Sequence, residues 1–170
     1  TGIEQQMPAD AATVTAGANR DAVIDVERNH DYLLWRYQLN PFVNPVFMSA
    51  RCEGRLLGWM VASVTGNDHT SGNILDVCVG NENFDAVLYA LYQQAMSYFK
   101  SQSVNNVVCW RSEHPGDAGR MNHFVRWGLR KQVHVINFVI QVDEQQVDPA
   151  FVTDTKNWSI SMALTEGRMG

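Results

Sequence analysis

Three acid–base side chains are the first candidates for chemistry in this sequence. Asp76 lies inside an apolar segment, where burial would raise the pKa of a carboxyl group and suit it to general-base work. Glu113 and His114 directly follow a later apolar segment, and histidine is the commonest general base near neutral pH. Each has a structural alternative, which is the commoner outcome for such residues: a hydrogen-bonded strand-edge carboxylate for Asp76, and an exposed turn before Pro115 for the other two.

The three cysteines are candidates for a redox, metal or nucleophilic site. Cys52, Cys78 and Cys109 are widely spaced, each within an apolar segment, and neither C-x-x-C nor H-x-x-x-H spacing occurs. Cys78 and Cys109 would face each other on neighbouring strands, but apolar surroundings favour buried thiols over a thiol nucleophile. We therefore predict no disulfide framework, no metal site and a reducing, cytoplasmic location.

The composition narrows the classes of partner. The chain has 170 residues, of which 45% are hydrophobic and 18% charged, and this suits one domain with a substantial core. Its net charge of −5 and the lack of a Lys/Arg cluster argue against a nucleic-acid surface. No apolar run is long enough to span a membrane, and no signal sequence is evident. These properties argue against nucleic acid and a membrane as partners.

The N-terminal part of the chain predicts an arm followed by helix. Residues 1–19 are rich in Ala, Thr, Gly and Gln without an apolar period, so we expect a linker or flexible arm before one domain over residues 20–170. A helix is predicted over residues 31–39, capped by Asp31 and stopped by Pro41. A further helix is expected around residues 20–28.

The rest of the chain alternates strands and helices. Apolar residues occupy both parities of residues 55–65, which predicts a strand covered on both faces. A long apolar period at three- and four-residue steps predicts a helix over residues 84–100 with Asn83 as its cap, and Gly128 ends a shorter helix. The expected elements are strands 46–52, 55–65 and 73–79, helix 84–100, strand 106–110, helix 118–127, strand 133–142 and a last strand around 158–163.

This order of elements, with four short segments, resembles the GNAT superfamily of N-acetyltransferase-like proteins, and most of all the degenerate GNAT-like domains of polysaccharide-biosynthesis clusters. The resemblance covers roughly residues 20–165 and implies an α/β (mixed α+β) fold, with a central mixed sheet of about six to seven strands flanked by helices. The segments that carry it are DYLLWRYQLNP at 31–41, GRLLGW at 54–59, FVRWGL at 124–129 and WSIS at 158–161.

The resemblance implies acetyl-CoA or another acyl-CoA as cofactor, bound between strands 73–79 and 106–110. Members of the superfamily hold the pyrophosphate on backbone amides of a Q/R-x-x-G-x-G loop, where a helix begins. This sequence departs from that motif: only Gly80 is a glycine, Glu82 adds a carboxylate, and Phe84 takes a glycine position. The residues expected at the cofactor are Val77, Cys78, Val79, Gly80, Asn81 and Asn83.

The resemblance also assigns chemical roles. Many relatives place a tyrosine acid on the fourth helix, where this chain has Phe124 beside His123. Asp76 or Glu113 would then deprotonate the acceptor, and Trp35, Tyr37 and Trp59 would line its pocket or belong to the core. The implied function is acyl transfer to an amine or hydroxyl of a small polar or sugar acceptor. The alternative is a non-catalytic binding or interaction domain of a larger protein that shares the fold.

Overall fold

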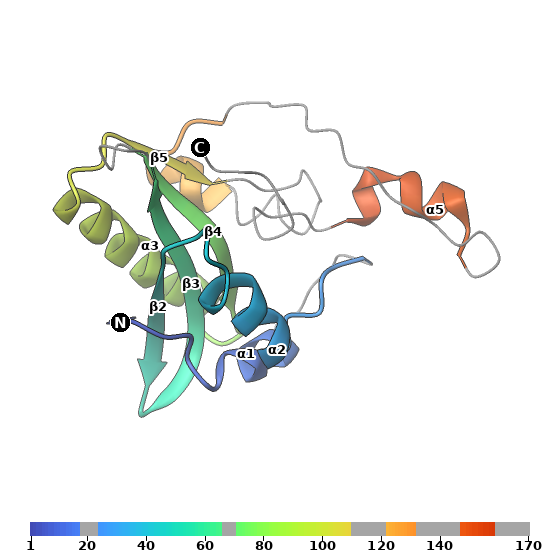
Figure 1. Cartoon of the computed structure of the whole chain (residues 1–170), viewed down its shortest axis with the longest axis horizontal. Coiled ribbons are helices and arrows are strands. Elements are labelled where there is room, and N and C mark those ends of the chain that lie inside the picture. The colour runs from blue at the N-terminus through green and yellow to red at the C-terminus, as the bar shows by residue number, and fades with distance from the viewer. Residues whose placement is uncertain (18–23, 66–70, 110–121, 132–146, 159–170) are drawn as a thin grey trace. The chain divides into compact units, whose positions relative to one another are not determined.

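The computed structural model describes residues 1–17, 24–65, 71–109, 122–131 and 147–158 (Figure 1). The chain forms two compact units. The first holds Thr1–Asn19, Glu27–Trp110 and Ser161–Gly170, and the second holds Arg20–Val26 and Arg111–Ile160. The strand predicted at 133–142 lies outside the described residues, as does the strand predicted around 158–163 except for Trp158, which forms an isolated β-bridge with Ile24.

A mixed sheet forms the centre of the first unit. Its described strands lie in the order β1-β2-β3-β4-β5, with antiparallel neighbours except for the parallel pair β4–β5. This confirms the mixed α+β class, with five strands among the described residues where six to seven were expected. The strands are β1 (Gly2–Glu4), β2 (Pro45–Cys52), β3 (Arg55–Thr65), β4 (Ser71–Val79) and β5 (Asn106–Cys109).

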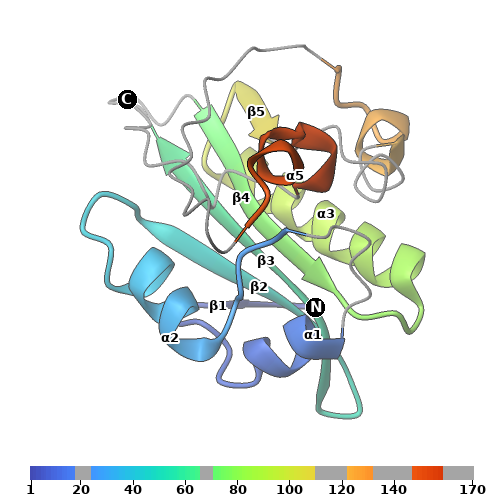
Figure 2. The ribbon, with the colours of Figure 1, turned by 90° about the vertical axis from the view of Figure 1, so that its right-hand side faces the viewer.

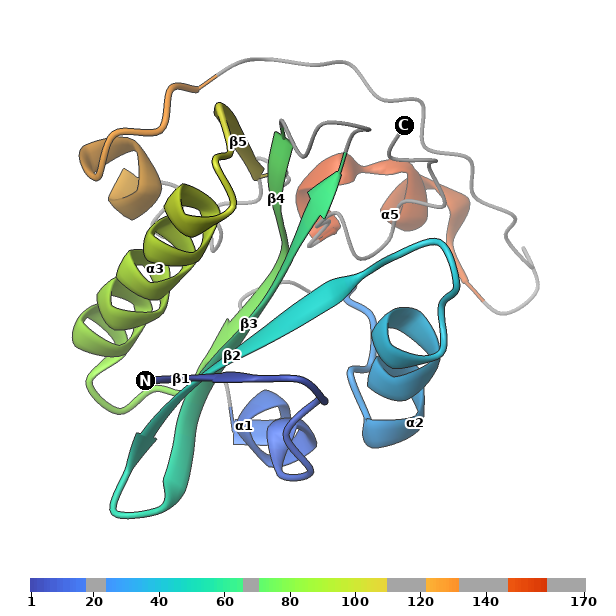
Figure 3. The same ribbon diagram turned by 60° about the vertical axis from the view of Figure 1, so that its left-hand side comes forward.

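Strand β3 is covered on both faces, as its apolar residues of both parities predict. Glu53 and Gly54, both with positive φ, turn the chain from β2 into β3. Successive residues of β3 then meet different helices: Gly58 faces Val87 of α3 (Phe84–Ser101), whereas the Trp59 indole N–H donates to the Ala11 carbonyl of α1 (Ala11–Gly17). Because neighbouring strand residues point to opposite faces, α3 and α1 cover opposite faces of the sheet (Figure 3).

Helix α3 lies close against its face of the sheet. A Cβ added at Gly72 would lie 2.6 Å from the Phe99 ring, and one at Gly58 would lie 2.8 Å from Val87. Both glycines are therefore required by close packing rather than by a turn. The buried residues of α3 follow the predicted apolar period and include Val87, Leu88, Leu91, Ala95 and Phe99.

The N-terminal segment is part of the core, which differs from the flexible arm expected over residues 1–19. Strand β1 lies beside β2 and pairs with it (Figure 2). Met7, Ala11 and Val14 are buried in the same cluster as Trp59. Ala11 and Val14 stand at i and i+3 on α1, which is helical spacing, whereas Met7 lies before the helix. The signal was weak because alanine and threonine dominate the segment, although Ala11 is buried and its carbonyl accepts from the Trp59 indole.

The helix predicted over residues 31–39 is present with different ends. It begins as α2 (His30–Leu33) and continues as the π-helix η1 (Leu34–Gln38). Its cap is Asn29, whose side chain accepts from the Tyr32 N–H at 2.9 Å, rather than Asp31. The helix predicted around 20–28 is wrong for its described part, since residues 25–28 have no regular structure and Ile24 forms a β-bridge. The β-branched residues Ile24 and Val26 favour that extended conformation.

The second unit is described in part. Residues 122–126 are helical and Gly128 has φ of 113°, as its predicted helix end requires, while residues 118–121 lie outside the description. Two short helices were not predicted: α5 (Pro149–Thr153), capped by Asp148, and the 3-10 helix η2 (Thr155–Asn157). None of the helices that the structure describes is long and apolar enough to cross a membrane.

Candidate functional site

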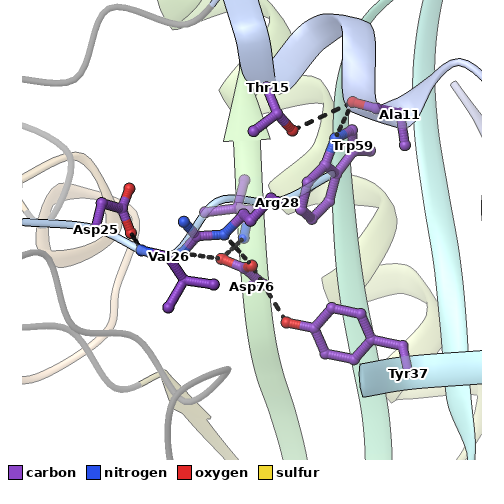
Figure 4. A network of polar contacts seen from close by, with 9 residues as sticks. Ala11, Thr15, Asp25, Val26, Arg28, Tyr37, Trp59 and Asp76 are labelled. Atoms are coloured by element: carbon purple, nitrogen blue, oxygen red, sulfur yellow. Dashed lines mark hydrogen bonds and ion pairs between the residues drawn. The ribbon is translucent and has the colours of Figure 1, made fainter. Parts of the chain in front are cut away.

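Asp76 is the centre of a buried polar cluster in the first unit. Its Oδ2 atom accepts from the Arg28 Nε–H at 2.7 Å and from the Tyr37 hydroxyl at 3.2 Å (Figure 4). Its Oδ1 atom accepts from the backbone N–H of Val77 at 3.0 Å. Arg28, Tyr37 and Asp76 are all buried, and Asp76 is fully inaccessible to solvent. Both carboxylate oxygens are therefore engaged by donors of the protein itself.

The cluster is assembled by an irregularity in β4. Val61 pairs with Asp76 and Ala62 pairs with Ile74, so Leu75 is an extra residue on β4. Such a bulge re-aims side chains. Leu75 packs in the same core cluster as Val61, the residue opposite Asp76. Tyr37 comes to this face from η1, and Arg28 from the segment just before α2.

Charge compensation explains how this cluster is tolerated in the core. The Arg28 guanidinium neutralises the Asp76 carboxylate, and charged partners of this kind make short, strong hydrogen bonds. Burial, and then the nearby Asp76 charge, raise the pKa of the Tyr37 hydroxyl well above its usual value. Tyr37 therefore stays protonated and donates. Asp76 has the hydrogen-bonded arrangement of its structural alternative, on a central strand rather than at an edge.

The residues expected at the cofactor follow Asp76 directly. The side chains of Val77, Cys78 and Val79 are buried, so only their backbone could contact a ligand. Gly80 donates its N–H to the Leu57 carbonyl at 2.9 Å, which ties the loop to β3. Asn81 and Asn83 are exposed.

The start of α3 differs from its predicted form. Asn83 is the N-cap residue, as predicted, but it lies in the left-handed region with φ of 51° and its side chain makes no capping hydrogen bond. Left-handed asparagine is common in turns because its short polar side chain tolerates that region. Its carbonyl still accepts from the Val87 N–H at 3.0 Å, which opens the helix.

Arg55, which the sequence did not indicate, lies beside this loop. Its guanidinium pairs with the Glu82 carboxylate, and both side chains are largely exposed. Arg55 begins β3 and Glu82 follows β4, so the antiparallel pairing of these strands brings the two charges together. The pair could not be predicted from the sequence, because its two residues are 27 positions apart.

The cysteines do not form the facing pair that was expected. The parallel register places Cys109 opposite Ile74, four residues before Cys78 on β4. Cys78 is buried, Cys109 is partly buried, and Cys52 is exposed at the end of β2, where the hairpin turns away from the core. Among the described residues no three His, Cys, Asp or Glu side chains lie close enough to hold a metal ion.

The remaining candidates fall in different places. Glu113 and His114 lie outside the described residues. Tyr37 and Trp59 belong to the core, whereas Trp35 is 62% exposed, so the three do not line one pocket. In the second unit Phe124 is buried edge-on to Trp127, with ring centroids 5.9 Å apart, and His123 also packs on Trp127.

Known proteins resemble this chain in structure but not detectably in sequence. No protein-family model matches the chain, and no curated protein sequence matches it. A transcriptional regulator from Bacillus halodurans C-125 matches with a TM-score of 0.60 at 12% identity, over 82% of this chain and 99% of that one. An aminoglycoside antibiotic 6'-N-acetyltransferase from Acinetobacter haemolyticus matches with a TM-score of 0.55 at 14% identity, over 84% and 100%. This chain has the GNAT fold.

A third match is partial. An aminoglycoside acetyltransferase from an uncultured soil metagenomic sample matches with a TM-score of 0.50 at 13% identity, and covers 57% of this chain and 66% of its own length. At such identities the likeness concerns the GNAT fold alone. The expected resemblance is thereby confirmed at the level of architecture, and the activity has to be argued from the site.

Proposed function

We propose that this GNAT-fold chain is an acyltransferase that moves an acyl group from acyl-CoA to an amine or hydroxyl of a small polar or sugar acceptor. One observation carries the proposal: β4 pairs in parallel with β5 and runs through the loop 80–83 into α3. A strand, a tight loop and a helix start in this order place backbone amides and the positive end of a helix dipole together, as anion sites require.

The residues of the loop fit a phosphate-bearing cofactor in part. Residues 77–83 would hold the cofactor mainly through their backbone, since the side chains of Val77, Cys78 and Val79 are buried and the Asn83 side chain makes no capping hydrogen bond at α3. Glu82 opposes an anion, but Arg55 already balances its charge. We therefore expect acetyl-CoA or another acyl-CoA to bind here more weakly than to a loop with the full glycine motif.

The protein's own groups would divide the work of transfer as follows. Acyl-CoA supplies the acyl group as a thioester. A backbone N–H of β4 would polarise the thioester carbonyl, as in an oxyanion hole. Asp76, Glu113 and His114 are the proposed bases for the acceptor. The four donor contacts of Asp76 with Arg28, Tyr37 and Val77 hold it as a carboxylate and favour a positioning role for it over proton transfer.

The same contacts favour a second candidate function. A non-catalytic binding or interaction domain needs neither a free base nor a complete phosphate loop. Asp76 is engaged by Arg28, and the Gly80 N–H is engaged by Leu57. Both features support this alternative, in which the GNAT fold is kept for binding.

Ligand-linked stability separates the two candidates. We expect acetyl-CoA to raise the melting temperature of the whole chain, because a ligand that binds only the folded state stabilises it by about 2.7 kcal/mol at a hundredfold excess over its Kd. Adenosine monophosphate at equal concentration is the control, since it lacks the pyrophosphate and the thioester arm. No shift with acetyl-, succinyl- or longer acyl-CoA would refute the acyltransferase and leave the binding domain.

A further inference from the structure

We propose that Arg55 and Glu82 form a charge switch that sets the affinity of the loop 80–83 for the phosphates of acyl-CoA. Glu82 holds Arg55 when no ligand is bound, and Arg55 moves to the phosphates when the cofactor arrives. This inference rests on the proposed acyl-CoA site, and it names the residues that regulate the occupancy of that site.

The pair is built so that it can open. The Arg55 side chain is 65% exposed and that of Glu82 is 55% exposed. Exposed ion pairs contribute little to stability because water and salt screen them and long side chains lose freedom in holding them. Arg55 can therefore leave Glu82 without any rearrangement of the core.

The backbone keeps Arg55 beside the loop in either state. Gly58 of β3 pairs with Val79, and the Gly80 N–H donates to the carbonyl of Leu57, two residues after Arg55. These bonds are formed by the sheet itself and do not depend on the ion pair. Because the backbone of Arg55 is held at this end of β3, its long side chain stays within reach of the loop.

A cation beside the loop would strengthen its hold on phosphate. The Gly80 N–H is directed to Leu57 and the Val77 N–H to the Asp76 carboxylate, so neither is directed to a ligand. Glu82 and Asp85 add negative charge at the start of α3. Arginine suits the missing role, since its planar guanidinium binds phosphate oxygens through two parallel N–H groups.

Glu82 thereby acts as an internal competitor. It occupies the guanidinium that the phosphates require, and its own charge repels them. Removing its charge should both release Arg55 and lift the repulsion, whereas removing the charge of Arg55 leaves Glu82 unopposed. The two substitutions should therefore change affinity in opposite directions, and their effects should not add.

The test is isothermal titration of the whole chain with acetyl-CoA at low and high salt. We expect Glu82→Gln to lower the Kd about 2- to 5-fold and Arg55→Gln to raise it by a similar factor, as expected for one charge pair near a surface. In the double variant Arg55→Gln with Glu82→Gln, the Glu82 change should improve the affinity only by removing its repulsion of the phosphates. The differences in Kd between the variants should become smaller in 0.5 M salt, because the screening length is then only about 3–10 Å.

The matched control is Asp10→Asn. Asp10 forms an exposed ion pair with Arg51 at 2.8 Å, so its loss makes the same change in net charge at a pair that includes neither Arg55 nor Glu82. An unchanged Kd in Glu82→Gln, or an equal gain in Asp10→Asn, would overturn the switch while leaving the proposed function standing. No binding of acetyl-CoA by any variant, Glu82→Gln included, would overturn the proposed function itself.

Discussion

At the scale of single residues, the buried Arg28–Asp76–Tyr37 cluster changes how Asp76 is understood. The apolar sequence around Asp76 indicated burial, and burial alone suggested a base. The structure adds partners from residues 28 and 37, and a carboxylate held by charged and neutral donors is stabilised in its ionised form. The sequence could not supply these partners, because neither Arg28 nor Tyr37 is near Asp76 along the chain.

Removing one member of the buried pair should be far more damaging than removing both. We expect Asp76→Asn to lower the free energy of unfolding by about 3–5 kcal/mol, because it leaves the Arg28 charge buried and uncompensated. The double variant Arg28→Met with Asp76→Leu should recover much of that loss. Urea unfolding measures both, with Asp10→Asn as a surface control worth about 1 kcal/mol or less. Equal stability of Asp76→Asn and wild type would contradict the buried pair.

The same cluster sets a dependence on alkaline pH. The folded pKa of Tyr37 is raised above its unfolded value, so its contribution to stability is complete below about pH 10, the ordinary tyrosine pKa. As pH rises further, the unfolded chain loses the proton first and stability falls. Denaturation followed from pH 8 to 11 should show this fall in wild type and a shallower one in Tyr37→Phe. Identical slopes in the two proteins would rule out Tyr37 as a source.

At the scale of elements, the sequence predicted best where a long period recurs. Helix α3 and strand β3 were found with nearly correct ends, since many apolar residues repeat at their spacing. Helix α1 was missed because its core contacts come from Ala11 and Val14 among threonines, and its packing on Trp59 decides its structure. The π-helical turn of η1 gave no sequence signal, since tertiary contacts such as Tyr37 to Asp76 fix it.

Met7 tests whether the N-terminal segment belongs to the fold. We expect Met7→Ala to lower the free energy of unfolding by about 2–5 kcal/mol, the range for a buried methionine truncated in a core. Its neighbour Gln6 is exposed, so Gln6→Ala should change stability by about 0.5 kcal/mol or less. Thermal and urea unfolding of the two variants provide the measurement. A flexible arm would instead leave both variants unchanged.

Gly72 tests how closely α3 lies on the sheet. Gly72→Ala places a methyl group 2.6 Å from the Phe99 ring, so we expect a loss of about 1–3 kcal/mol from overpacking. Gly2→Ala is the matched control, because its added methyl would meet its nearest neighbour at an ordinary 3.7 Å. The double variant Gly72→Ala with Phe99→Leu should recover part of the loss in urea unfolding. Equal stability of the two alanine variants would contradict the close approach.

At the scale of the whole chain, the ordered set of segments was enough to identify the GNAT fold, and the site was only partly predictable. The chain matches structures with this fold at 12–14% identity, so packing and topology are kept where sequence is not. Position along the chain located the loop 77–83, because its place after β4 is fixed by topology. The charges around the loop were not foreseeable, since Arg55 reaches Glu82 from another strand.

The long-range contacts of the N-terminal segment also bear on how the protein folds during synthesis. The Trp59 indole bonds to Ala11, and Arg28 bonds to Asp76, and each contact joins residues 48 positions apart. Strand β1 likewise cannot pair until Ser49 and its neighbours on β2 have been synthesised. Closing such loops costs chain entropy before any contact repays it, and it slows folding. Residues 1–17 therefore leave the ribosome before their partners on β2 and β3, and until those partners follow the segment is open to chaperones and proteases.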